Sequence, residues 1–297
     1  MNSIVKNTIG LIALAAGTTS AHAATLPEGA MSFSWTSATA SSNSLWYRDD
    51  FTGEINEFSP DGTLRDISTG VKMNYGLLPN VELFGSIGVI NKSQTLSNGS
   101  TFINKTEPTY LAVGAKTSLP SLLEINSNIY GRFDYAFNAD QEFFFTSGND
   151  RSHHIAVGME NSYLLPWLST FVFMENNFIY RTQHASQYQG TWGAGWSNGK
   201  FMVSGFYHLL SSIDSGFDCF HDPTDENQFH FLPLYKANSE NSRTRGAGWD
   251  MHHGPGASVS MTISQAMSVE FFTYIKIAGV NTDRTASLGA NLTYALY

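Results

Sequence analysis

The chain has 297 residues and a formal net charge of −9, with 14% charged and 13% aromatic residues. Soluble domains usually carry about a quarter charged residues, so an ordinary soluble enzyme is a poor match for this composition. The acidic balance argues against nucleic acid as a partner, and the single cysteine, Cys219, excludes an intramolecular disulfide framework.

The first two dozen residues have the pattern of a secretory signal peptide. Lys6 precedes a short apolar run over 9–16, and Ala21-His22-Ala23 matches an A-x-A cleavage site. The apolar run is too short to span a bilayer. We therefore expect residues 1–23 to be removed on export and residues 24–297 to form one exported domain.

Strand-like segments follow along the rest of the chain, and the connections between them alternate in length. The short connections lie at 77–80, 119–122, 165–168, 197–200 and 264–267. The long, polar connections lie at 41–65, 91–106, 138–152, 183–190 and 211–247, with a brief one at 281–284. The segments between them predict about twelve antiparallel strands, and the alternation is typical of an outer-membrane barrel with short periplasmic turns and long extracellular loops.

Within the segments, apolar and polar residues alternate with a period of two. Over 267–277 the odd positions are mostly apolar, whereas the even positions include Ser268, Glu270 and Lys276. Successive strand residues face opposite sides of a sheet, so each strand has one apolar and one polar face. A secreted β-sandwich shows the same alternation, although its outer face is usually richer in Lys and Glu.

Aromatic residues on the apolar positions favour the barrel over the sandwich. Tyr75, Tyr163, Trp196 and Tyr294 fall near the short connections, and Tyr135, Phe137, Tyr180 and Trp249 fall near the long ones. Two such bands match the aromatic girdles at the two interfaces of a membrane. We predict an all-β, antiparallel up-and-down transmembrane β-barrel in the outer membrane of a Gram-negative bacterium, with its apolar faces in lipid.

Three short stretches carry a resemblance to a known family. They are Leu26-Pro-Glu-Gly-Ala-Met-Ser-Phe-Ser-Trp35, Gly76-Leu-Leu-Pro-Asn-Val-Glu-Leu-Phe-Gly85 and Gly289-Ala-Asn-Leu-Thr-Tyr294. These resemble the opening strand, first turn and closing strand of outer-membrane proteins of the MetA-pathway phenol-degradation group. The resemblance implies a transporter of small solutes, hydrophobic or aromatic ones among them. One departure is that the terminal Tyr297 lies on the polar positions, whereas the apolar series ends at Leu296.

Charged residues of both signs occupy the polar positions, which face the lumen of a barrel. The predicted lumen-lining residues are Lys72, Glu82, Lys116, Glu124, Arg132, Asp134, Glu160, Glu175, Arg181, Lys200, Glu270 and Lys276. About eight strands leave an interior just filled by side chains and 16–18 leave an open channel, so twelve allow a narrow path or a plugged one. These residues either line a pore or form an ion-pair network that fills the barrel.

The longest connection, 211–247, contains several large apolar residues. We expect it to fold towards the barrel mouth and narrow the lumen with Phe229, Phe231, Leu232, Leu234 and Tyr235. The alternative is a loop that packs on its neighbours outside the mouth.

Histidines are the remaining candidates for chemistry, because neutral imidazole is a common metal ligand. The two adjacent pairs, at 153–154 and 252–253, offer at most one inward ligand each, His154 and His252 by position. We predict no metal site, no cofactor and no catalytic residue.

Two other functions remain open alongside the channel. An outer-membrane lipid hydrolase could use the outward-facing His153 or His253, and a structural or adhesive barrel could bind partners with its loops. The expected partners are outer-membrane lipid, lipopolysaccharide bridged by divalent ions to acidic loops, and small solutes. The oligomeric state is left open.

Overall fold

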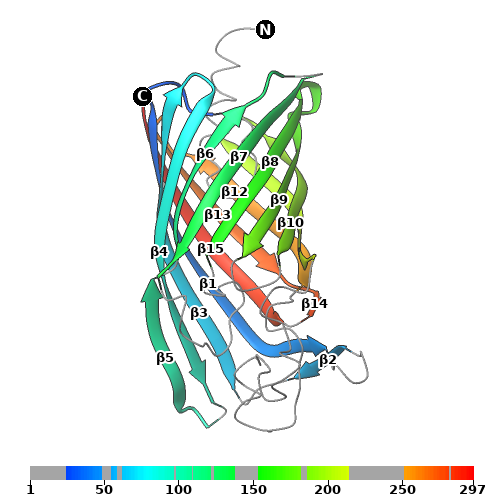
Figure 1. Ribbon diagram of the computed structural model, residues 1–297. Coiled ribbons are helices and arrows are strands. Elements are labelled where there is room, and N and C mark those ends of the chain that lie inside the picture. The colour runs from blue at the N-terminus through cyan, green and yellow to red at the C-terminus, as the bar shows by residue number, and fades with distance from the viewer. Residues whose placement is uncertain are drawn as a thin grey trace.

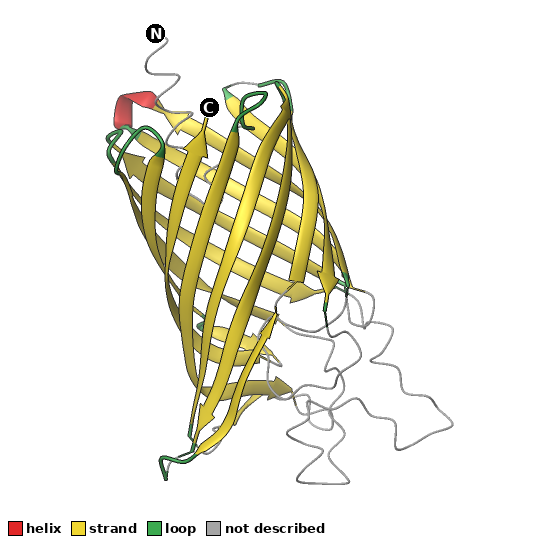
Figure 2. Ribbon diagram, turned by 90° about the vertical axis from the view of Figure 1, so that its left-hand side faces the viewer, coloured by secondary structure: helices red, strands yellow, loops and turns green. Residues whose placement is uncertain are grey.

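The computed structural model describes residues 25–48, 55–58, 62–96, 98–108, 110–121, 124–137, 153–181, 186–213, 251–280 and 282–297. These residues form a closed antiparallel barrel (Figures 1 and 2). The predicted loop residues Phe229, Phe231, Leu232, Leu234 and Tyr235, and the girdle residue Trp249, lie outside the described ranges.

Twelve strands make up the barrel wall. They are β1 (Met31–Arg48), β3 (Thr63–Leu78), β4 (Val81–Thr95), β6 (Tyr110–Ser118), β7 (Ile125–Ala136), β8 (His154–Leu165), β9 (Thr170–Arg181), β10 (Gln187–Ser197), β11 (Phe201–Ser212), β12 (Met251–Thr262), β13 (Met267–Ile275) and β15 (Thr282–Leu296). Three shorter strands, β2 (Ile55–Phe58), β5 (Thr101–Pro108) and β14 (Ala278–Val280), pair with β1, β4 and β12. A 3₁₀ turn, η1 (Pro166–Leu168), connects β8 to β9.

The ring closes because the first and last strands pair along most of their length. Met31 of β1 lies opposite Leu296 of β15, and the pairing continues to Trp46 opposite Thr282. The start of β1 and the end of β15 therefore lie at the same end of the barrel, as an even number of antiparallel strands requires. All five expected short connections lie at this end, here called the short-turn end, and the predicted twelve-stranded barrel is confirmed.

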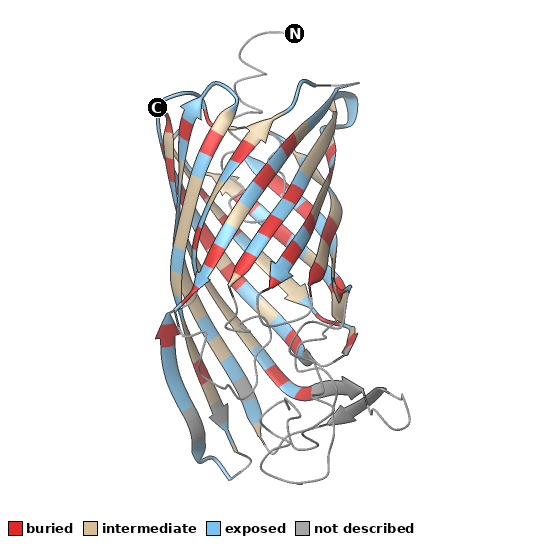
Figure 3. Cartoon of the chain, in the orientation of Figure 1, coloured by how far each residue is buried: buried red, intermediate tan, exposed pale blue. Residues whose placement is uncertain are grey.

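Burial alternates along the strands with the period of two that the sequence predicts (Figure 3). The polar positions point inward and are mostly buried, as with Ser32 and Ser34. Phe33 and Trp35, which alternate with them, are exposed. Exposed apolar side chains recur on the outer face of almost every strand. A belt of this kind is stable when lipid rather than water surrounds it. In the described ranges, no helix is long and apolar enough to cross a membrane.

Two of the predicted long loops are largely strand. β1 and β3 stay paired as far as Ser42 opposite Leu64, and the hairpin of β4 and β5 fills most of 91–106. Together with β2, these strands extend well beyond the strands on the other side of the barrel (Figure 1). The apolar half of the period-two pattern fades where a strand leaves lipid, although backbone pairing continues, so the sequence suggested loops there.

Candidate functional site in the barrel lumen

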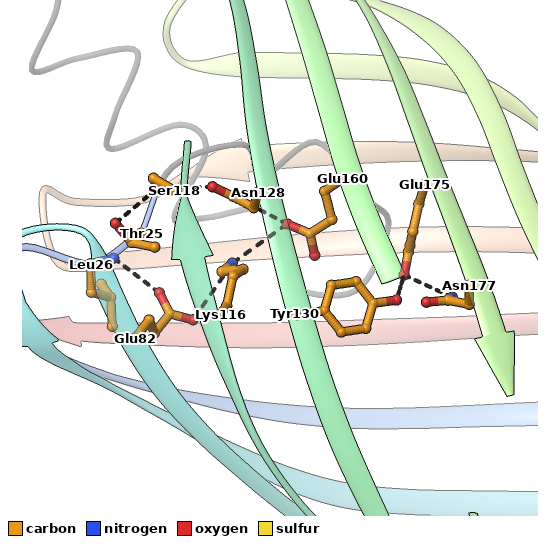
Figure 4. A network of polar contacts seen from close by, with 10 residues as sticks. All are labelled: Thr25, Leu26, Glu82, Lys116, Ser118, Asn128, Tyr130, Glu160, Glu175 and Asn177. Atoms are coloured by element: carbon orange, nitrogen blue, oxygen red, sulfur yellow. Dashed lines mark hydrogen bonds and ion pairs between the residues drawn. The ribbon is translucent and has the colours of Figure 1, made fainter. Parts of the chain in front are cut away.

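The inner face of the barrel carries a connected set of charged and polar side chains centred on Lys116. The Lys116 Nζ lies 3.6 Å from Glu82 Oε1 and 3.6 Å from Glu160 Oε2. Asn128 donates through Nδ2 to Glu160 Oε2 at 3.1 Å and accepts from the Ser118 hydroxyl at 2.8 Å (Figure 4). These residues come from β4, β6, β7 and β8. We call them the Lys116 cluster.

Strand register explains why these side chains meet. Glu82 lies directly opposite Lys116 between β4 and β6, and Asn128 lies directly opposite Glu160 between β7 and β8. Directly opposed residues on one face of a sheet have Cβ atoms about 5 Å apart, which is within reach of long polar side chains. Glu82 and Lys116 are 4% and 8% exposed, so each charge depends on its partner for stabilisation.

A third carboxylate, that of Glu175, adjoins this cluster. Glu175 on β9 is the register partner of Glu160 on β8, which places two acidic side chains side by side. Glu175 Oε1 accepts from the Tyr130 hydroxyl at 2.7 Å and from Asn177 Nδ2 at 3.2 Å (Figure 4). Like charges that are directly opposed are destabilising, so the donors around each carboxylate and the nearby Lys116 compensate for that repulsion.

Lys72 on β3 differs from the cluster because its inward side chain is exposed. Its Nζ lies 5.3 Å from the centroid of the Phe84 ring, a cation–π distance. An inward residue can be exposed only where the lumen has open space beside it. The barrel is therefore not filled completely by side chains at the level of Lys72.

A third group lies nearer the long-loop end. Arg132 Nε is 2.9 Å from Asp134 Oδ1, and His154 Nδ1 is 3.7 Å from Asp134 Oδ2. The ring of Tyr110 lies against His154 with centroids 4.7 Å apart. Arg181 is buried and is the register partner of His154. Basic and acidic side chains therefore lie close together in this group as well as in the Lys116 cluster.

The opposite side of the lumen, formed by β11, β12, β13, β15 and β1, carries many small hydroxyl residues together with the buried Glu270 and Lys276. Ser204 and Ser258 share a hydrogen bond of 2.9 Å, and Ser34 and Thr293 share one of 3.0 Å. Thr36 donates to Asn291 Oδ1 at 3.0 Å. Ser34, Ser204, Ser258 and Thr293 are buried, so their hydroxyl groups hold neighbouring strands together by hydrogen bonds on the inner face.

Six aromatic rings on the inner face lie over glycines. In each case the glycine is the direct register partner of the aromatic residue on the next strand. The pairs are Phe84–Gly114, Tyr130–Gly158, Phe171–Gly195, Phe173–Gly193, Phe206–Gly256 and Phe272–Gly289. A Cβ placed on any of these glycines would lie between 2.1 and 2.5 Å from the Cζ atom of the partner ring. Because the glycines have no side chain, the rings can lie along the inner wall.

Ten of the twelve predicted lumen-lining residues lie on or directly beside the strands at inward positions, whereas two do not. Glu124 lies in the turn before β7 with a φ of 64° and is exposed, and Lys200 lies in the turn before β11 and is also exposed. In the sequence each of these residues directly precedes an apolar strand residue, Ile125 or Phe201, and so falls on the polar positions of that strand. The backbone leaves the barrel wall there, so the alternation no longer reports an inward direction.

The histidines in the described ranges are spread over both faces of the barrel. His208 and His252 point inward with ring centroids 5.8 Å apart, while His253 shares a hydrogen bond with the Tyr207 hydroxyl and His153 accepts one from the Ala136 amide. In the part of the chain that the structure describes, no three His, Cys, Asp or Glu residues are grouped to hold a metal ion.

Several lumen residues were not among those predicted from the sequence. Asn128, Tyr130 and Asn177 share the inward positions of their strands. They are uncharged, so charge on an inward position, which marks the other lumen residues, does not mark them. Thr25 and Leu26 precede the first strand, and nothing in the period-two pattern marks them.

The chain matches no protein-family model and no curated protein sequence. Its fold is similar to that of the COG4313 outer membrane channel from Pseudomonas putida F1, with a TM-score of 0.67 and 8% identity over 93% of this chain and 98% of that chain. The NanC porin is more distant, with a TM-score of 0.49 and 8% identity over 88% of this chain and 98% of that chain. At 8% identity, the similarity to the COG4313 channel shows a shared barrel fold alone.

Proposed function

We propose that this protein is an outer-membrane channel of a Gram-negative bacterium that passes small solutes through the barrel lumen. The observation that carries the proposal is the exposed inward side chain of Lys72 beside the buried Lys116 cluster. A barrel filled for stability alone would leave no such open space. The sequence supports the location, because residues 1–23 have the pattern of a signal peptide.

The solutes that suit this lumen combine a flat or apolar part with polar groups. Paired charges supply hydrogen-bonding partners, and the partly exposed rings of Phe84, Phe206 and Phe272 supply flat apolar surface. The segments that resemble the phenol-degradation group point to the same class of solute, with small hydroxylated aromatic compounds as its simplest members. The neighbouring COG4313 structure is described as an outer membrane channel, which agrees with this proposal.

The test is conductance of the purified protein in planar bilayers, followed by swelling of liposomes in phenol-like solutes and in sugars of similar size. We expect discrete conductance steps and faster swelling with the aromatic solutes. Absence of conductance from a correctly assembled barrel would contradict the channel and favour an adhesive or structural role. Equal swelling rates in the aromatic solutes and the sugars would be consistent with a channel but would contradict the proposed preference for aromatic solutes.

A further inference from the structure

The chain reverses direction immediately before the first strand. The Ala30 amide donates to the Pro27 carbonyl at 3.0 Å, and Gly29 has a φ of 81°. A positive φ at the third position is typical of a type II turn, in which glycine is favoured. The turn is fixed to β3 by two further bonds, from the Gly29 amide to the Gly76 carbonyl at 2.8 Å and from the Gly76 amide to the Ala30 carbonyl at 2.9 Å.

This turn brings the preceding residues onto the inner face of the barrel. The Leu26 amide donates to Glu82 Oε2 at 2.9 Å, and Leu26 is only 2% exposed. The Thr25 and Ser118 hydroxyls share a hydrogen bond of 3.1 Å (Figure 4). Residues 25–30, which we call the N-terminal hook, therefore contact the Lys116 cluster directly through Glu82 and Ser118.

Gly76 provides the space in which the hook lies. A Cβ at this position would be 1.9 Å from the Pro27 carbonyl oxygen and 2.9 Å from the Leu26 carbonyl oxygen. Both separations are far shorter than a van der Waals contact. No residue other than glycine can occupy position 76 unless the hook moves.

We propose that the N-terminal hook forms the constriction of the channel at its short-turn end, with Glu82 as the residue that positions it. The proposal deepens the channel function and rests on it. Glu82 uses one carboxylate oxygen for Lys116 and the other for the Leu26 amide, so a single side chain connects the hook to the charged lumen. Solutes leaving the cluster towards the short-turn end must then pass Thr25 and Leu26.

The hook is suited to this role because its attachment is local. On the expected processing after Ala23, the mature chain begins one residue before Thr25. The hook would then be a terminal segment, joined to the barrel covalently only through β1. Displacing it leaves every strand pairing of the barrel wall in place, so its effect on conduction can be separated from folding.

The first test compares Gly76→Ala with Gly131→Ala. The added methyl at position 76 must displace the hook, whereas a Cβ at Gly131, on the outer face of β7, meets nothing within 4 Å. We expect Gly76→Ala to raise the single-channel conductance and Gly131→Ala to leave it at the wild-type value. A difference in gel migration between unheated and heated protein serves as the check on assembly. Wild-type conductance in an assembled Gly76→Ala protein would overturn the proposal.

The second test holds the hook in place with a disulfide. Thr25→Cys and Ser118→Cys are combined with Cys219→Ser, which removes the only native cysteine. Because the two hydroxyls are 3.1 Å apart, oxidation should join the new cysteines, with a mass loss that a reductant reverses. Failure of the bond to form in the assembled barrel would show that the hook does not lie where we place it.

The disulfide also separates this proposal from the channel function itself. Combining the disulfide with Gly76→Ala should prevent the rise in conductance until the bond is reduced. A wild-type protein without conductance would overturn the channel, whatever the hook does. If the protein conducts but neither Gly76→Ala nor reduction of the disulfide changes the conductance, only the proposal that the hook forms the constriction is overturned.

Discussion

Tyr130 on β7 and Gly158 on β8 are register partners, and the tyrosine ring occupies the space that a side chain at position 158 would need. The ring therefore lies along the wall, and its hydroxyl reaches Glu175 Oε1 on the strand beyond, at 2.7 Å. The pair links two properties of the barrel. The missing side chain of Gly158 keeps the ring out of the lumen, and the position of the ring supplies a donor to a lumenal carboxylate.

Gly158→Ala tests this relationship. The new Cβ would lie 2.5 Å from Tyr130 Cζ and 2.3 Å from Asn177 Oδ1, so both side chains must move. We expect the ring to move into the lumen and lower the conductance, and the free energy of unfolding to fall by about 1–3 kcal/mol, as in other overpacked sites. Gly205→Ala, where a Cβ meets nothing within 4 Å, is the control. Equal conductance in the two variants would contradict the prediction.

The number of strands, their inward faces and the short turns could be predicted from the sequence because each depends on local alternation. The pairs of aromatic residues and glycines could not. They depend on the register between neighbouring strands, and a shift of one residue would place Tyr130 opposite a different residue on the other face. Once the register is known, Tyr130 and Gly158 are seen as partners, although the sequence separates them by 28 positions.

Some residues of the candidate site could be predicted from the sequence and others could not. Glu82, Lys116 and Glu160 were assigned to the lumen because charge and inward position coincide on their strands. The N-terminal hook was not predicted, since Thr25 and Leu26 lie outside any strand and contact the cluster only through a turn. Glu124 was assigned to the lumen although the chain leaves the wall at that residue, where φ is 64°.

Lys116→Met should destabilise the barrel because it leaves Glu82 and Glu160 without the cation that lies between them. Removing one partner from a buried ion pair costs about 3–5 kcal/mol of unfolding free energy. Urea unfolding in lipid vesicles measures the change. Lys200→Met removes an exposed lysine from a turn and should stay within about 0.5 kcal/mol of wild type.

A double variant makes the argument about Lys116 more specific. Adding Glu160→Gln to Lys116→Met removes one of the two uncompensated carboxylates, so we expect part of the lost stability to return. The stability changes caused by two substitutions in one ion-pair network do not simply add, and the difference from additivity measures the interaction between the two residues. Strict additivity of the two substitutions would show that Lys116 and Glu160 do not stabilise each other.

Lys72→Glu should change the ion selectivity of the channel. Lys72 is exposed on the inner face, so its charge acts on ions in the lumen rather than on a buried partner alone. Replacing a cation with an anion there should shift the reversal potential in a potassium chloride gradient towards cation selectivity. Lys72→Arg keeps the charge and should leave the reversal potential unchanged. If the two variants give the same reversal potential, Lys72 does not face the conducting path.

Phe271→Lys tests whether the outer face of the barrel lies in lipid. Phe271 is the central residue of β13 and is 59% exposed, whereas its neighbour Glu270 is completely buried on the inner face. A lysine on the lipid face near the middle of a membrane costs about 2–4 kcal/mol, and the cost falls towards zero near the interfaces. We therefore expect a large loss of unfolding free energy in lipid vesicles for Phe271→Lys. Tyr297→Lys, beyond the end of β15 at the short-turn end, should have little effect. Similar stabilities for the two variants would mean that water rather than lipid surrounds β13.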